Sequence, residues 1–566
     1  MGSGSGSGSG SAAPVVPEFR NPDAPVDPLN AAVTGSGATF MVASESAQAT
    51  KVGKDILAGG GNAVDAAVAV AFALAVVHPT AGNLGGGGFA VVRTAPGKAT
   101  ALDFRETAPA SASADMYLGP DGKPTKDSLA GYRASGTPGA VAGLFELHKK
   151  LGKKPWKDVI EPAITLARDG FKIDKGTAFA ITARQDLLLT YPETAAIWLP
   201  GRIAKKEGDT VAIPLLAVAL ERIRDQGPDG FYKGETAKAI ADAMKANGGT
   251  ITLADLAGYK AVWREPLRFA YRGKSVVSMP PPSSGGIVLA MTAGMLRDVE
   301  VGTLAWHGPE HVHWVTEAWR RAFAARNSVL GDPDFVKDMP IAKLLSPEHL
   351  QALAKSIGPN ASVSADIKPI PDGDHTTNLC VVDGAGMSVS ITTTLNTAWG
   401  SGVTIHGFLM NNEMDDFAVK PGAPNVFGLV QSATNKIEPG KRMLSSMTPA
   451  FVEDAKGELV MVLGAQGGPR IISAVWQVLS NVIDFDRPVD AAVALPRFHH
   501  QHLPDKVYLE QLSISKSTED ALKAQNYTLD WRPSAREFGA ANAIVRTKQG
   551  WSGAADPRGG GAALGD

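Results

Sequence analysis

The chain has 566 residues, of which 44% are hydrophobic and 20% are charged, a composition typical of an ordinary globular protein. Lys and Arg total 55 against 57 Asp and Glu, so no net positive field exists to attract nucleic acid or an anionic membrane. The only cysteine, Cys380, excludes an intrachain disulfide and a multi-cysteine zinc site.

The chain opens with MGSGSGSGSGS, a low-complexity run typical of a flexible leader added to an expressed protein. We therefore leave residues 1–26 out of the fold prediction, as an artificial leader and flexible N-terminus. We also expect that this leader replaces a natural export signal.

A buried helix is predicted soon after this leader. The stretch from Ala66 to Val77 is apolar and uncharged, but it is shorter than the roughly 20 residues that span a bilayer. Asn62 can cap a helix that begins at about Ala63, and His78-Pro79 ends it. The sequence thus indicates a core helix and no membrane anchor.

Later segments alternate between strand and helix signals. Gly85–Gly88 predicts a turn into the strand FAVVRT. Between residues 139 and 260, apolar residues recur at helical spacing, which predicts a helical cover. Residues 337–374 are polar and rich in turn residues, so we expect an exposed connector there.

The segments TNLCVVD and MSVSITTTLN, joined by DGAG, predict a β-hairpin. In the second strand, one face carries Met387, Val389 and Ile391, and the other carries Ser388, Ser390, Thr392, Thr394 and Asn396. One face should therefore join the core, and the other should be polar. With a loop of two or three residues centred on Gly384-Ala385, Thr376 lies opposite Thr393 or Thr394.

A glycine turn follows the predicted strand ELVMVLGAQ. Gly467 and Gly468 precede Pro469, and proline favours the first position of a helix, so backbone N–H groups there would point outward. Such donors suit a developing oxyanion, and removing one typically costs about 100- to 1,000-fold in rate. The helix should pack on a sheet through one apolar face, formed by Ile471, Val475, Val478 and Val482.

Each of these patterns also has a simpler interpretation. Threonine is common in strands whatever its function, and most Gly-Gly-Pro sequences are only turns. His499, His500 and His502 lack spaced carboxylate or cysteine partners, so we expect hydrogen-bonding histidines and no metal. AGGGNAVDA and GNLGGGG lack the residues of a phosphate loop and the spacing of a dinucleotide fingerprint, so we expect no nucleotide cofactor.

Taken together, segments from most of the chain after the leader resemble gamma-glutamyltranspeptidases. They are GGGNAVDAAVAVAFALAVVHP, GNLGGGGF, DFRETAP, HTTNLCVV, TLNTAWGSG, NNEMDDF, KPGAPNVFGL, MLSSMTP, GAQGGPRII, PRFHHQHLPD and GAADPR. Each segment alone is a weak signal, but their number and order make the resemblance specific. It implies an α/β fold, the four-layer αββα sandwich of N-terminal nucleophile hydrolases. It further implies a precursor that is split into a large subunit, residues 27–375, and a small subunit, residues 376–566.

The resemblance implies that Thr376 attacks the carbonyl of His375 and that water hydrolyses the resulting ester, so that Thr376 becomes the first residue of the small subunit. Its new α-amino group titrates near about pH 8 and can accept the hydroxyl proton. Thr376 would then move the γ-glutamyl group of glutathione, glutamine or a related amide to water or to an amine. Thr394 matches the family's second threonine, and Gly467 and Gly468 match its oxyanion hole.

The resemblance also implies the residues that hold the glutamyl head group. Arg105 matches the arginine for the α-carboxylate, and its planar fork suits bidentate pairing. The hydroxyl donors beside it would be Ser445 and Ser446, and the α-amino group would be held by Asn396, Glu413 and Asp416.

Two aromatic residues stand near these segments. KPGAPNVFGL resembles the lid loop of bacterial members, with Phe427 where a tyrosine is common, so the hydrogen bond of that tyrosine is lost. Trp399 either shapes the acceptor side or packs in the core.

Two other functions compete with this one. A cephalosporin or glutaryl acylase of the same superfamily shares the threonine chemistry, but Glu413 and Asp416 would repel an acyl group without an ammonium. A catalytically silent γ-glutamyl-peptide binding protein would lack Thr376, Thr394 or the glycine pair, and all of these are present. The resemblance places the enzyme in the periplasm of a bacterium, or outside the cell, as a heterodimer of its two subunits.

Overall fold

The computed structural model describes residues 31–364 and 376–566. Two seven-stranded sheets form its centre, and every pairing within them is antiparallel. The first sheet runs in the order β1 (Val33–Gly37), β20 (Gly550–Ala555), β19 (Ala540–Thr547), β15 (Leu459–Gln466), β14 (Ala450–Glu453), β9 (Lys274–Ser278) and β8 (Leu267–Tyr271). The second runs in the order β21 (Ala562–Gly565), β2 (Met41–Ser44), β10 (Thr376–Val382), β11 (Ser388–Thr394), β3 (Gly87–Ala95), β4 (Lys98–Phe104) and β7 (Val262–Arg264).

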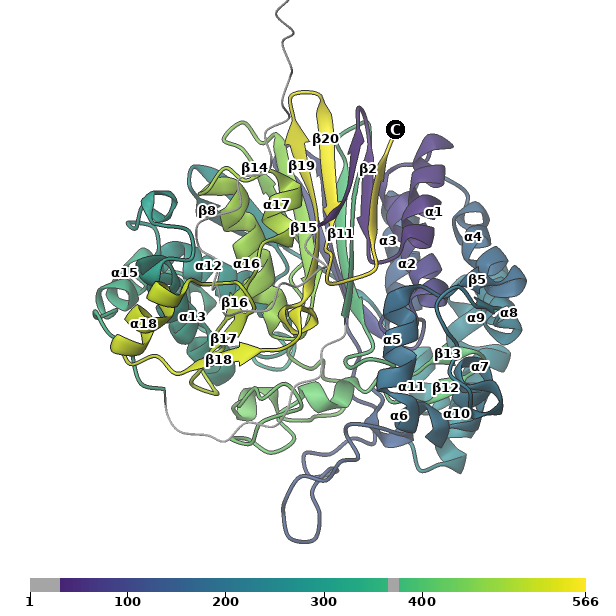
Figure 1. Cartoon of the computed structure of the whole chain (residues 1–566). Helices are drawn as coiled ribbons and strands as arrows, with labels where there is room; N and C mark the ends of the chain where they lie inside the picture. Colours follow the sequence, from purple (N-terminus) through teal and green to yellow (C-terminus); the bar gives the residue numbers. More distant parts are fainter. Residues whose placement is uncertain (1–30, 365–375) are drawn as a thin grey trace, which may run out of the picture.

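Helices lie on the outer side of each sheet (Figure 1). Beside the second sheet are α1 (Ala47–Ala58), α2 (Ala63–Val77), α3 (Ala140–Leu151), α4 (Trp156–Asp169), α5 (Lys175–Ala183), α6 (Gln185–Thr190), α7 (Pro192–Trp198), α8 (Pro214–Gln226), α9 (Asp229–Tyr232), α10 (Gly234–Ala246) and α11 (Leu253–Gly258). Beside the first are α12 (Gly285–Met295), α13 (Pro309–Val329), α14 (Ile341–Leu344), α15 (Pro347–Lys355), α16 (Arg470–Ile483), α17 (Val489–Ala494) and α18 (Lys516–Ala524). The fold is thus mixed α/β, as predicted.

The predicted core helix is confirmed as α2. Asn62 accepts a hydrogen bond from the N–H of Asp65, and the Asp65 carboxylate accepts one from the N–H of Asn62, which closes a capping box. Every residue of α2 is buried, because the helix packs between α1, α4 and strands β10 and β11. Within the described residues, no helix combines the length and the apolar character that crossing a bilayer requires.

The two sheets pack face to face, since β15 contacts both β10 and β11. The polar face of β11 therefore points at the other sheet and is buried, with Ser390 donating to the carbonyl of Leu463 at 3.0 Å. Asn378 donates to the carbonyl of Ile391 at 2.8 Å and packs on Gly464, where a Cβ would lie 2.1 Å from the Asn378 amide nitrogen. The predicted alternation is confirmed, but both faces of the strand belong to the interior.

Cys380 lies in this layer between the sheets. Its side chain is fully buried, and its sulfur lies 3.5 Å from the backbone carbonyl of Asn542. Asn542 also joins Glu45 to β10, since its amide lies 2.9 Å from the Glu45 carboxylate and 3.0 Å from the carbonyl of Asn378. Polar side chains thus connect β10 to the first sheet through Asn542 of β19.

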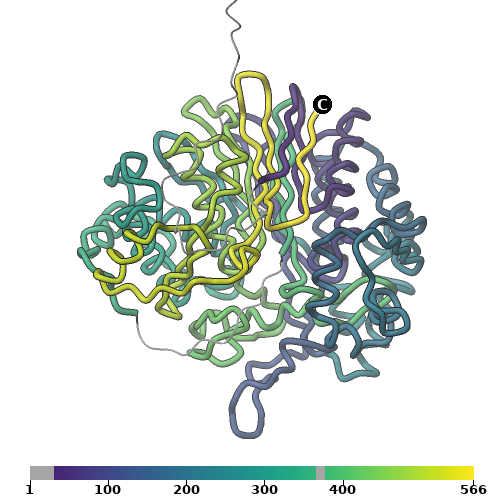
Figure 2. The backbone as a smooth tube through the Cα atoms, viewed as in Figure 1, coloured from purple at the N-terminus to yellow at the C-terminus, as the bar shows by residue number. Residues whose placement is uncertain are grey.

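Strands from the two ends of the described chain meet at one edge, where β2 pairs with β21 (Figure 2). Outside the main sheets, short pairings join β5 (Phe171–Lys172) to β6 (Thr210–Val211) and β12 (Thr404–Ile405) to β13 (Phe408–Leu409). A third sheet contains β16 (Phe498–His499), β17 (Val507–Glu510) and β18 (Leu529–Arg532).

The predicted connector is wrong for part of its length. Helices α14 and α15 occupy residues 341–355, and Ser346 caps α15 by accepting from the N–H of His349, with Pro347 at the first helical position. Buried Leu350 packs in the core beneath α12, which explains why this polar segment folds. Residues 365–375, including His375, lie outside the described residues.

Candidate active site

Thr376 begins β10, and Thr394 ends β11 directly opposite it. This confirms the hairpin register that pairs Thr376 with Thr394. The Thr376 hydroxyl donates to Oγ1 of Thr394 at 3.5 Å, and the backbone N–H of Asn396 donates to the same oxygen at 2.7 Å. Both threonines are buried, so the pair of hydroxyls lies in a site with little water.

The glycine turn lies across the gap between the sheets, at the end of β15. Gly467 has φ 126° and Gly468 has φ 53°, values that favour glycine. A Cβ at Gly467 would lie 2.7 Å from Cα of Gly539, so the turn also needs a residue without a side chain. Gly468 and Pro469 line the same small pocket as Thr376. Pro469 stands at the N-cap of α16, one position before the predicted one.

The helix that follows the turn packs as predicted. Ile471, Val475 and Val478 are fully buried, and Val482 is partly buried against the same core. α16 contacts β15 and β19. This packing fixes the direction in which the turn presents its backbone.

A cluster of charges forms one wall of the pocket. Arg105, which follows β4, donates through Nη1 to the Glu413 carboxylate and through Nη2 to the Asp416 carboxylate. Both acidic residues come from a short 3₁₀-helix, Glu413–Asp416. Glu106 adds a third carboxylate, with an oxygen 3.5 Å from Nη1 of Arg105. The structure thus brings together three residues that the resemblance assigned to the head group.

Burial and mutual charge shift the pKa values of this cluster. Burial opposes ionisation of Arg105, but Glu413, Asp416 and Glu106 outweigh it and raise the pKa of the guanidinium. Burial raises the pKa of the Glu413 and Asp416 carboxyls, with Arg105 opposing the rise. Burial likewise raises the pKa of Glu106 to about 7. One oxygen of Glu413, Oε2, is buried and makes no hydrogen bond to any residue that the structure describes.

The remaining predicted head-group residues complete the wall. Ser445 and Ser446 precede β14 and line the pocket together with Asn396. The side-chain amide of Asn396 donates to the carbonyl of Asn412 at 3.0 Å, which fixes the orientation of this side chain. Ser445 is fixed by backbone hydrogen bonds to Pro282 and Ser284.

Sequence reasoning missed Arg326. This residue extends from α13 into the same pocket, is 2% exposed and donates to the hydroxyl of Ser446 at 3.4 Å. A lone arginine near the end of a long amphipathic helix gives no sequence signal that separates it from a surface cation.

The two aromatic residues differ in position. Phe427 is nearly buried and lines the pocket; its carbonyl accepts from the side-chain amide of Gln501 at 3.0 Å. Trp399 is fully buried and packs edge-on against Trp198, with ring centroids 5.1 Å apart. Its indole N–H donates to the carbonyl of Ala180 at 3.1 Å, so the observed position is the core one.

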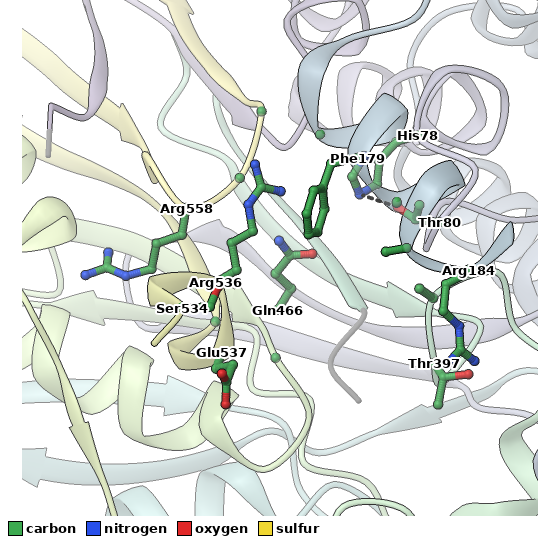
Figure 3. A pocket seen from close by; sticks show the side chains of 18 of the residues that line it. His78, Thr80, Phe179, Arg184, Thr397, Gln466, Ser534, Arg536, Glu537 and Arg558 are labelled. Atoms are coloured by element: carbon green, nitrogen blue, oxygen red, sulfur yellow. Dashed lines mark hydrogen bonds between the residues drawn. The ribbon is translucent and has the colours of Figure 1, made fainter. Parts of the chain in front are cut away.

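A second cavity, of about 420 Å³, is lined by Gly467, and Figure 3 shows the side chains around it. Thr397 lines it close to the end of β11, and Gln466 lines it at the end of β15. Arg184 and Arg536 also face this cavity, and the guanidinium of Arg536 lies 5.2 Å from the ring centre of Phe179. The two cavities therefore meet at the glycine turn.

Two of the three histidines of RFHHQHLPD, His499 and His500, make side-chain hydrogen bonds, whereas the buried Nδ1 of His502 has no hydrogen-bond partner among the described residues. His499 lies 2.8 Å from the Ser473 hydroxyl and 2.9 Å from Oε1 of Gln501, and His500 lies 3.4 Å from the Asp505 carboxylate. Burial keeps the pKa of His499 well below its usual value. Among residues 31–364 and 376–566, no group of three or more His, Cys, Asp or Glu side chains is placed to hold a metal ion.

A buried hydroxyl beside a second hydroxyl, a glycine turn at a helix start and an ion-paired wall is typical of enzymes that transfer acyl groups. The Gamma-glutamyltranspeptidase family model matches residues 49–566, and the chain belongs to this family. It is 45% identical to the "Glutathione hydrolase proenzyme" of Escherichia coli (strain K12), over 92% of this chain and 90% of the relative. It is 42% identical to the protein of the same name from Pseudomonas aeruginosa, over 92% and 94%.

Solved structures agree with this membership. The cephalosporin acylase from Bacillus halodurans superimposes with a TM-score of 0.83 at 26% identity, covering 99% of both chains. Helicobacter pylori gamma-glutamyltranspeptidase matches with a TM-score of 0.55 at 40% identity, over 56% of this chain and 91% of that one.

Proposed function

We propose that this chain is a self-cleaving γ-glutamyltransferase and glutathione hydrolase. The observation that carries the proposal is the single small pocket in which Thr376 and Thr394 face the Arg105–Glu413–Asp416 cluster. A γ-glutamyl group carries a carboxylate and an ammonium on one carbon, and this wall offers charges of both signs to them. The identity of 45% to a glutathione hydrolase proenzyme supports the same substrate class.

The first step is cleavage of the chain before Thr376. The Thr376 hydroxyl adds to the carbonyl carbon of His375, the peptide C–N bond breaks, and the nitrogen becomes the α-amino group of Thr376. Water then hydrolyses the ester, which divides the chain into residues 1–375, containing the large subunit of residues 27–375, and the small subunit of residues 376–566. The word "proenzyme" in the names of the relatives supports this maturation, as does the shorter length of the matched Helicobacter pylori chain.

The mature site then transfers the acyl group. The α-amino group of Thr376 takes the hydroxyl proton while the oxygen attacks the γ-carbonyl, and backbone N–H groups of Gly467 and Gly468 stabilise the oxyanion. The amine leaves with that proton, and a γ-glutamyl ester remains on Thr376. Water or a second amine attacks the ester and releases glutamate or a new γ-glutamyl compound. Thr394, 3.5 Å away, holds the attacking hydroxyl in place.

The head-group residues assigned by resemblance have matching chemistry. Arg105 with Ser445 and Ser446 would bind the α-carboxylate, and Glu413, Asp416 and Asn396 would bind the α-amino group. The ammonium of an incoming substrate would pair with Glu413 and Asp416, the two carboxylates that form ion pairs with Arg105 in the structure. The second cavity, beyond Gly467, suits the leaving peptide or the acceptor amine, with Phe427 in the loop that covers the glutamyl side.

We also assign the sheets and outer helices to the four-layer αββα sandwich of N-terminal nucleophile hydrolases, an assignment that the TM-score of 0.83 to an acylase supports. Export to the periplasm or the medium is inferred from the resemblance alone. Fractionating a bacterium that naturally makes the protein tests this placement.

An acylase is the second candidate, because the Bacillus halodurans enzyme has the same fold. Glu413 and Asp416 oppose it, since a glutaryl group brings no ammonium to balance two buried carboxylates. Turnover of γ-glutamyl-p-nitroanilide and of glutaryl-p-nitroanilide separates the two: the transferase hydrolyses the first and the acylase the second.

Self-cleavage is tested by intact mass and N-terminal sequencing after incubation at neutral pH, with Thr376→Ala as the control. We expect two fragments, the smaller beginning Thr-Thr-Asn-Leu, and an uncleaved control. A single chain under folding conditions would contradict a self-activating enzyme and favour the silent binding protein.

A further inference from the structure

Arg326 is a buried cation in the catalytic pocket for which the transfer reaction has no assigned use. Its backbone lies on α13, outside the two sheets, and its side chain crosses to line the pocket beside Ser446 and Thr376. Only 2% of the residue is exposed. An arginine at such a position is costly to bury unless a partner balances its charge.

The hydrogen-bond partners of this guanidinium among residues 31–364 and 376–566 are all neutral. Nε donates to the hydroxyl of Ser284 at 3.2 Å, Nη1 to the side-chain oxygen of Asn327 at 3.0 Å, and Nη2 to the hydroxyl of Ser446 at 3.4 Å. In the part of the chain that the structure describes, no carboxylate comes within 4.0 Å of it, the limit for an ion pair. Burial is the main cause that lowers the pKa of Arg326 to about 10; the charge of Asp416 opposes this shift, and the charge of Arg105 adds to it.

Arg105 is in the opposite situation. Glu413 and Asp416 are both hydrogen-bonded to it, and Glu106 lies 3.5 Å away, so its charge is already balanced before any substrate enters. A substrate carboxylate that relied on Arg105 alone would compete with these carboxylates. Arg326, on the side of Ser446, makes no ion pair with a carboxylate of the described residues, although the charge of Asp416 acts on it from beyond 4.0 Å.

We propose that Arg326 is a second cationic group for the α-carboxylate of the γ-glutamyl substrate, which it binds together with Ser446 and beside Arg105. This inference rests on the proposed function and adds a specificity residue to it. The carboxylate of the substrate becomes the counter-ion of Arg326, while the ammonium of the substrate pairs with Glu413 and Asp416. The pocket then selects for the complete amino-acid head group, because each end of it neutralises a different buried charge.

The test compares Arg326→Gln with the unchanged protein on two substrates that differ only in the α-carboxylate: γ-glutamyl-p-nitroanilide and 4-aminobutyryl-p-nitroanilide. A lost charge-assisted hydrogen bond is worth about 1.5–3 kcal/mol, so kcat/KM for the γ-glutamyl substrate should fall about 10- to 150-fold, mainly through KM. For the aminobutyryl substrate it should change less than about threefold by the same reasoning. Inhibition constants of L-glutamate and of 4-aminobutyrate give the same comparison from binding.

Arg321→Gln is the matched control on the same helix. Its guanidinium bonds to Glu317 and Ser356, away from the pocket, so it should not discriminate between the two substrates. If Arg326→Gln fails to fold or to cleave itself, Arg326→Lys keeps the charge without the fork and should still show a selective loss on the γ-glutamyl substrate.

Equal losses on both substrates, or no loss, would overturn the proposal and leave Arg326 with a structural role under Ser284 and Ser446. The failure of the proposed function gives a different result, because the unchanged protein would then not hydrolyse γ-glutamyl-p-nitroanilide at all.

Discussion

The substitution Gly467→Ala tests the glycine turn at the centre of the proposed mechanism. The residue has φ 126°, and an added Cβ would lie 2.7 Å from Cα of Gly539 and 3.2 Å from its nitrogen. A side chain in such a backbone region costs about 1–3 kcal/mol. The close contact is with backbone atoms, which cannot be relieved by a change of side-chain rotamer. The turn should therefore rotate, which misdirects its N–H groups.

Misaligning one oxyanion donor typically lowers kcat by about 100- to 1,000-fold. The assay is hydrolysis of γ-glutamyl-p-nitroanilide, expressed per cleaved molecule as counted by intact mass, so that slow maturation is not mistaken for slow catalysis. Gly208→Ala is the matched control: Gly208 also has positive φ, 84°, but no atom within 4 Å of its Cβ position. That variant should lose stability and keep its kcat. A kcat near that of the unchanged protein in Gly467→Ala would refute the role given to this turn.

Three further changes have defined outcomes. Thr394→Val removes the oxygen that lies 3.5 Å from the Thr376 hydroxyl, so kcat should fall about 5- to 150-fold. Thr394→Ser keeps a hydroxyl and should recover most of the lost kcat. Equal values of kcat in the two variants would contradict a role for this hydrogen bond in catalysis. Burial, and then the charge of Asp556, raises the pKa of Glu45 from 4.5 to about 8 in the folded state. The folded state therefore binds this proton more tightly than the unfolded state, and the stability declines as the pH rises from 4.5 to about 8. Glu45→Gln cannot ionise, so its thermal midpoint should be higher than that of the unchanged protein at pH 9 and not at pH 4. Asp65→Ala leaves three backbone N–H groups without their acceptor and should lower the free energy of unfolding by about 1–3 kcal/mol in urea, with kcat unchanged.

Local patterns in the sequence predicted the hairpin that begins with Thr376 and the core helix α2. The alternation after Met387 and the short DGAG loop limit the partner of Thr376 to Thr393 or Thr394, because a hairpin register follows from loop length and side-chain periodicity. The structure selects Thr394, as the family resemblance also implied. The uncharged run from Ala66 to Val77 predicts a helix with no exposed face, and α2 has none. These properties depend on neighbours in sequence.

Other features depend on contacts distant in sequence. The polar face of β11 gives no sign that a second sheet covers it, since that sheet comes from segments before and after the hairpin. Arg326 looks like any surface arginine until α13 is placed beside Ser446. Helix α15 could have been found, because Ser346-Pro347 is a helix-start signal, but the polar composition around it favoured a connector.

Because Cys380 is buried, the reactivity of its thiol can report on local unfolding of the protein. The thiol sits between the sheets, and burial raises its pKa, so it stays protonated and unreactive at neutral pH. A thiol-specific reagent can then label the chain only when β10 separates from β15 and β19, the strands packed over its polar face. Because this is the only cysteine, the labelling rate measures how often the strand that begins with Thr376 opens, without any engineered probe.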